Sequence, residues 1–177
     1  MAARIDGFVV SSAPVFLAFL AVHVAAGLTC VVSGALAALS PKGRRRHVLA
    51  GKIYFGGICV LVASATGLAI MRWREDYGFF LIGLVAFCFA LTGFLARERH
   101  WPGDTPHIVG MGGSYIAMLT AFYVDNGKKL PLWDKLPTAA FWVLPSAIGI
   151  PIIWRALRKY AHASPAGRNA SQSGSGS

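Results

Sequence analysis

Acidic residues are scarce in this sequence, and charge of either sign is missing from its long hydrophobic segments. The 177 residues include 7 Asp and Glu against 17 Lys and Arg, and charged residues make up 14% of the chain. Soluble domains usually carry about 25%. With 55% hydrophobic residues and a mean hydropathy of +0.57, the composition excludes an ordinary soluble domain and indicates an integral membrane protein.

Cysteines and known hydrolase motifs are also few or missing. The three cysteines, Cys30, Cys59 and Cys88, fall in three different hydrophobic segments and have no metal-ligand spacing, which predicts packing residues buried in lipid or protein rather than a disulfide framework. The chain contains no Gly-x-Ser-x-Gly and no His-Glu-x-x-His, so the sequence argues against a hydrolase.

Five hydrophobic segments are long enough to cross a bilayer as helices. A helix rises about 1.5 Å per residue, so about 20 apolar residues span roughly 30 Å of hydrocarbon. The sequence therefore predicts an all-α integral membrane protein, a single five-helix bundle over residues 1–160 followed by a flexible, linker-like Gly/Ser tail over 161–177. The predicted spans are 13–39, 53–71, 77–96, 108–124 and 138–154.

Basic residues are distributed unevenly between the two sides of this predicted bundle. Segments 42–52, 97–99 and 155–168 fall on one side and hold most of the 17 Lys and Arg residues. By the positive-inside rule this side faces the cytoplasm, which predicts a multi-pass protein of the cell (inner) membrane with its N-terminus outside and its C-terminus in the cytoplasm.

The net charge of +10 is explained by this topology and does not indicate nucleic-acid binding. The expected partners are instead the lipid bilayer and, at Arg44, Arg45 and Arg46, anionic lipid headgroups. Small residues in the spans allow close helix contacts, and a homo-oligomer is a further expectation.

One residue that titrates near neutral pH, His23, lies within the apolar cores, which contain no Asp, Glu, Lys or Arg. Ionisable residues are costly in a membrane and often functional. His23 precedes Ser40 by 17 residues, so it lies about 25 Å from the basic boundary along a straight helix. Two interpretations stay open: contact with a cofactor or quinone, or a hydrogen bond to a hydroxyl at similar depth. The candidate hydroxyls are those of Thr66, Thr120 and Tyr123.

Three further histidines, His47, His100 and His107, are predicted at the basic boundary. Imidazole is a common ligand of haem iron, Zn²⁺ and Cu²⁺. His47 and His107 are therefore candidate ligands of a b-type haem or, together with His100, of a divalent transition metal. Glu98 and Asp104 flank His100 and are candidate partners that orient its ring. The alternative is a surface or structural role for all three histidines in a basic, lipid-facing region.

The histidines belong to three motifs: His23-x3-Gly27-x6-Gly34, His47-x3-Gly51-Lys52-x-Tyr54 and His107-x3-Met111-x2-Ser114-Tyr115. These motifs resemble a family of bacterial membrane proteins of unknown function, over about residues 22–153. The resemblance implies four or five helices and marks His23, His47 and His107 as characteristic positions, without implying an activity. Relatives carry Arg near the methionine where this chain has two glycines, so the resemblance does not support anion binding at that point.

Two classes of function remain open. The first is a redox protein with haem or a metal held by His47 and His107, exchanging electrons with quinone near His23. The second is a non-catalytic membrane protein, either a permeation unit for small molecules or a scaffold subunit of a larger complex. The missing intramembrane carboxylates argue against a proton-driven pump. Whether the chain is an enzyme is left open.

Overall fold

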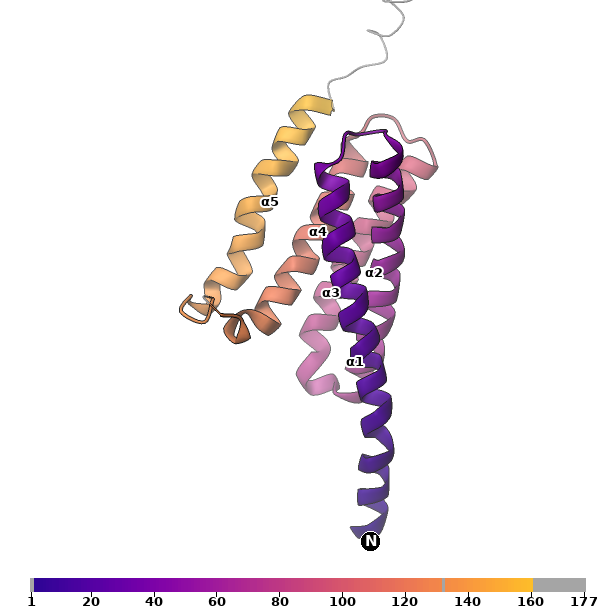
Figure 1. Cartoon of the computed structure of the whole chain (residues 1–177), viewed down its shortest axis with the longest axis vertical. Helices are drawn as coiled ribbons and strands as arrows, with labels where there is room; N and C mark the ends of the chain where they lie inside the picture. The colour runs from indigo at the N-terminus through magenta and orange to yellow at the C-terminus, as the bar shows by residue number, and fades with distance from the viewer. Residues whose placement is uncertain (1, 132, 161–177) are drawn as a thin grey trace, which may run out of the picture.

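The computed structural model describes residues 2–131 and 133–160 and consists mainly of five long helices (Figure 1). Each helix contains a segment long and apolar enough to cross a membrane, so the prediction of an all-α, multi-pass bundle is confirmed. The predicted tail, 161–177, lies outside the described residues. The elements are α1 (Ala2–Leu39), α2 (Arg45–Met71), α3 (Trp73–Glu98), α4 (Thr105–Asn126), the short 3-10 helix η1 (Gly127–Lys129) and α5 (Thr138–Tyr160).

Each of the five long helices extends beyond the apolar core that hydropathy marks. α2 begins at Arg45 and α4 at Thr105, whereas hydropathy alone places both starts further along the chain. The additional turns are more polar because helix ends reach the headgroup region, where Lys and Arg side chains meet water. As a result, His47 and His107 lie in the first turns of α2 and α4 rather than in connecting loops.

The helices form two antiparallel hairpins and one outer helix (Figure 1). α1 packs along α2, α3 packs along α4, α2 also contacts α3, and α5 packs against α4. At its N-terminal end α1 extends beyond the other helices. We call the opposite end of the bundle, which carries Lys42, Arg97, Arg155 and Lys159, the basic end; α1, α3 and α5 end there, and α2 and α4 begin there.

α1 and α2 meet through residues spaced seven apart in both helices. His23 is hydrogen-bonded to Ser64, and Cys30 lies against Gly57, which is seven residues further along α1 and seven residues back along α2. A Cβ on Gly57 would lie 2.6 Å from the Cys30 Sγ, so the bare glycine makes room for the buried thiol. Because two helical turns take about seven residues, this spacing keeps the same two faces together along the hairpin.

α3 and α4 approach each other closely at Gly93 and Gly110. A Cβ on Gly110 would lie 2.5 Å from the Gly93 Cα and 2.7 Å from the Phe89 carbonyl oxygen. Small residues allow such backbone contact, which is a main source of helix association in membranes because burial from water no longer drives it. The contact lies near the basic end, and it brings the start of α4 within reach of main-chain atoms of α3.

Two tyrosines, the buried Tyr54 and the half-buried Tyr115, connect α4 to the α1–α2 hairpin. The Tyr54 and Ser114 hydroxyls are 2.8 Å apart, and the Tyr115 hydroxyl donates to the Val31 carbonyl at 3.0 Å. Tyr54 belongs to the buried core cluster with Ile58 and is 2% exposed. Polar groups in a membrane interior must find partners within the protein, and these two bonds supply them while fixing α4 against α1 and α2.

Candidate functional site

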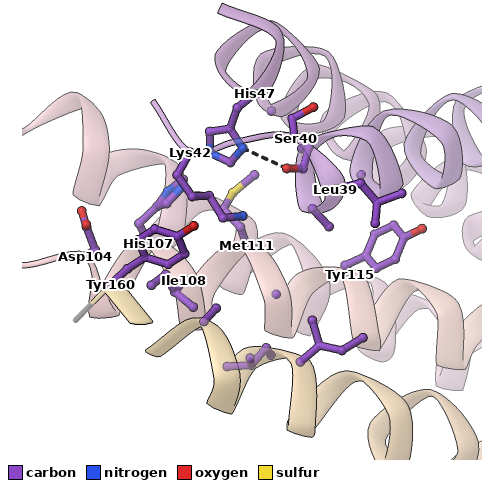
Figure 2. A pocket seen from close by; sticks show the side chains of 18 of the residues that line it. Leu39, Ser40, Lys42, His47, Asp104, His107, Ile108, Met111, Tyr115 and Tyr160 are labelled. Atoms are coloured by element: carbon purple, nitrogen blue, oxygen red, sulfur yellow. Dashed lines mark hydrogen bonds between the residues drawn. The ribbon is translucent and has the colours of Figure 1, made fainter. Parts of the chain in front are cut away.

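A pocket of about 580 Å³ opens at the basic end, between the ends of α1 and α5 and the starts of α2 and α4 (Figure 2). We call it the histidine pocket because His47 and His107 both line it. Its walls are mainly apolar and include Ile108, Met111 and Ile152. Pockets of this size and character are typical of sites for cofactors and other small molecules.

His47 is fixed by a main-chain acceptor at the end of α1. Its Nδ1 lies 2.9 Å from the Ala37 carbonyl oxygen, which can only accept a hydrogen bond. Nδ1 therefore carries the proton, and in the neutral imidazole Nε2 keeps its lone pair. Ala37 lies in the last turn of α1, where carbonyls lack an intrahelical partner, so the helix end supplies this acceptor.

His107 is fixed in the same way by a different helix. Its Nδ1 lies 2.9 Å from the Gly93 carbonyl oxygen on α3, so this nitrogen too is the donor. The Gly93–Gly110 contact described above brings α4 near enough for His107 to reach the α3 main chain. Again, the neutral ring leaves Nε2 available to a ligand.

The two imidazoles lie next to each other in the pocket. Their ring centres are 6.1 Å apart and their planes are inclined at 80°. α2 and α4 both start at the basic end and run parallel, so their motifs lie level: His47 is beside His107, and seven residues further along each helix Tyr54 bonds to Ser114. The tyrosine–serine pair thus lies two turns deeper than the histidine pair, towards the floor of the pocket.

Positive charge surrounds the mouth of the pocket. Lys42 and Arg97 lie close enough for their charges to act on both imidazoles. Arg97 donates to the Asp104 carboxylate at 2.8 Å, which offsets its charge. Desolvation by the neighbouring walls lowers the pKa of Lys42, and the nearby Tyr160 acts in the opposite direction. Figure 2 shows Lys42 and Tyr160 beside the histidine pair.

His100 lies apart from this pair. It is an exposed residue of the α3–α4 connection with a φ of 52°, and it does not line the pocket. Glu98 and Asp104, expected to orient His100, instead pair with Lys52 at 3.9 Å and with Arg97. Within residues 2–131 and 133–160, no three His, Cys, Asp or Glu side chains gather as a metal site would require. The three-histidine metal site stays a prediction.

His23 lies in the opposite half of the bundle. Its Nδ1 is 3.1 Å from the Ser64 hydroxyl, which itself donates to the Leu61 carbonyl, so the serine oxygen accepts from His23. The expected hydroxyl partners were Thr66, Thr120 and Tyr123; the threonines instead bond to carbonyls of their own helices, those of Val62 and Ile116. Ser64 follows His47 by 17 residues along α2, which separates the two levels by about 25 Å.

Sequence reasoning missed the two carbonyl acceptors, the Tyr54–Ser114 bond and the Ser64 partner. A signal was present for Tyr54 and Ser114, because both stand seven residues after the histidine of their motif. Main-chain acceptors leave no such signal, since every residue type carries a carbonyl.

No protein-family model, no curated protein and no solved structure matches the chain.

Proposed function

We propose that the histidine pocket binds a b-type haem whose iron His47 and His107 would hold, and that the protein is a redox protein of the membrane. The observation that supports this most is the histidine pair itself. Both rings donate Nδ1–H to a main-chain carbonyl and line one pocket. A metal-binding imidazole typically has this arrangement, because the hydrogen bond fixes the tautomer and raises the basicity of the other nitrogen.

The separation of the rings fits two ligands of one metal ion. Imidazole nitrogens bind metals at about 2 Å, which puts two ring centres on opposite sides of an ion roughly 6 Å apart. The observed distance is 6.1 Å. The ligands come from two different helices, α2 and α4, which are fixed to each other by the Tyr54–Ser114 bond deeper in the bundle. Two helices therefore hold the ring centres of the pair 6.1 Å apart at one pocket.

The pocket walls also suit a large, flat, apolar group with acidic substituents. Met111 and Ile108 follow His107 on α4, and Ile152 and Ile153 face them from α5. Haem iron held by two histidines would supply one-electron chemistry. The chain would supply the ligands, hold them in one tautomer and surround the ring with apolar side chains that keep water away.

An absorption spectrum of the full chain tests the proposal. Protein purified in detergent from cells supplied with iron and a haem precursor should show a Soret band that shifts on reduction. His47→Ala and His107→Ala should each lose this spectrum. His100→Ala is the matched control, since His100 is an exposed histidine of the same end of the bundle.

A colourless wild-type protein from haem-replete cells contradicts the proposal and favours a non-catalytic permeation unit or scaffold. A Soret band that survives unchanged in both His47→Ala and His107→Ala also contradicts it, because the iron would then be held elsewhere.

A further inference from the structure

The mouth of the histidine pocket carries more positive charge than the protein itself balances. Three cations line it from two elements: Lys42 in the α1–α2 connection, and Arg155 and Lys159 one turn apart on α5. Over the part of the chain that the structure describes, none of these three forms a salt bridge. The fourth cation of the mouth, Arg97, is already paired with Asp104.

The placement of these charges differs from that of ordinary membrane anchors. Arg158 lies on the same helix but does not line the pocket, and its guanidinium is 5.2 Å from the centre of the Trp154 ring. Arg155 and Lys159 do line the pocket, with Lys42, and the Lys159 ammonium also lies 5.3 Å from the centre of the Tyr160 ring. Lys42 is an exposed residue of the pocket lining, and partial desolvation lowers the pKa of its ammonium group. An anionic group at the mouth could form charge-assisted hydrogen bonds with these three cations.

The apolar walls and the cationic mouth together select an amphiphile with acidic groups at one end. Resting on the proposed function, we infer that Lys42, Arg155 and Lys159 bind the two propionate carboxylates of the haem at the mouth of the pocket. The apolar side chains of α4 and α5 that line the pocket would contact the porphyrin, and its acidic edge would face the basic end. These cations determine which tetrapyrrole the pocket accepts, and they do not ligate iron.

Esterification of the propionates separates this inference from iron ligation. The full-length wild-type chain, purified in detergent from cells grown without haem supplementation, would be titrated with ferric protohaem and with its dimethyl ester, following the Soret band. Charge-assisted hydrogen bonds contribute about 1.5–3 kcal/mol each, so protohaem should bind at least about tenfold more tightly than the ester. The position of the Soret band should be the same for both, because the ligands are the same.

A variant of the mouth identifies the residues responsible. Lys42→Gln, Arg155→Gln and Lys159→Gln combined should reduce the affinity ratio to near one, chiefly by weakening protohaem binding. Binding of the ester should change little, which also shows that the variant is folded. Arg158→Gln is the matched control and should keep the wild-type ratio.

Equal affinity of the wild type for protohaem and its ester overturns this inference and leaves haem binding by His47 and His107 standing. A ratio that the triple variant preserves overturns it as well, since other groups would then bind the propionates. If neither compound shows with the wild type the Soret shift of a haem held by two histidines, the proposed function fails and the inference fails with it.

Discussion

The two histidine levels of this bundle differ in what each imidazole bonds to and in what it faces. At the basic end, His47 and His107 donate to main-chain carbonyls and line a pocket together. In the opposite half, His23 bonds to the Ser64 hydroxyl and does not line the histidine pocket. His23, the most unusual residue in the sequence, is thus explained by a hydrogen bond to the neighbouring helix. The Nε2 nitrogens of His47 and His107 are not explained by such a bond.

The comparison suggests how depth and function are related in this protein. A polar side chain inside a membrane needs a partner, and one serine on the neighbouring helix is enough for His23. At the basic end the acceptors are main-chain carbonyls, one in the last turn of α1 and one further back in α3, and they bond to Nδ1 and leave Nε2 of each ring for a ligand. Function is therefore expected where helix ends meet, and packing is expected where two faces of a hairpin meet.

The largest expected effect comes from the glycine contact that supports the basic end. Gly110→Ala should separate α3 from α4, because its Cβ would lie 2.5 Å from backbone atoms of Gly93, which cannot turn aside. Overpacking of this kind costs about 1–3 kcal/mol or more, and it should also pull His107 away from the Gly93 carbonyl. The melting temperature in detergent should therefore fall, and the Soret band should weaken.

Gly67→Ala in the opposite half is the matched control for that change. Its Cβ would also meet an atom at 2.5 Å, but that atom belongs to the ring of Phe19, a side chain that can change its rotamer. We expect a small change in melting temperature and an unchanged spectrum. If Gly110→Ala and Gly67→Ala lowered the melting temperature and weakened the Soret band equally, the distinction between the basic end and the opposite half would be lost.

A smaller effect is expected at the level below the histidine pair. Tyr54→Phe removes the bond to Ser114, whose side chain is 0% exposed, and should cost about 1–2 kcal/mol of stability. Tyr115→Phe should cost less, because the Val31 carbonyl that it releases lies within α1 and keeps its helical partner. Unfolding in detergent measures both; a larger loss for Tyr115→Phe would contradict the assigned importance of the Tyr54–Ser114 bond.

The smallest effect is expected for His23. A double-mutant cycle with His23→Ala and Ser64→Ala should give a coupling energy of about 0.6 kcal/mol, the average for hydrogen bonds between membrane helices. The Soret band of all three variants should match that of the wild type. Loss of haem in His23→Ala alone would show that the two levels act together, and the separation drawn here would be wrong.

The fold could be predicted from the sequence because the bilayer imposes a simple length criterion. Five apolar segments predict five helices, and the structure contains them. The helix ends could not be placed, since hydropathy marks the apolar core and not the polar turns beyond it. That difference matters for function: it moves His47 and His107 from loops into the first turns of α2 and α4.

The site could be predicted only in part. Depth along the helices separates His23 from the basic boundary, and the motifs mark His47 and His107. The partner of His23 was expected at Thr66, Thr120 or Tyr123, because depth alone ignores the helix face. That face is set by the seven-residue spacing that pairs Cys30 with Gly57 and His23 with Ser64. His100 has the same residue type and level as the pair, yet the connection between α3 and α4 leaves it exposed.

Rescue by free imidazole tests the central claim most directly, namely that His47 and His107 are the axial ligands of one haem. In His107→Gly, the spectrum of a haem with two imidazole ligands should be lost and should return when imidazole is added, because the small ligand can occupy the space left by the side chain. His47→Gly should behave alike, and His23→Gly should need no rescue. A two-imidazole spectrum in His47→Gly or His107→Gly without added imidazole would contradict the account.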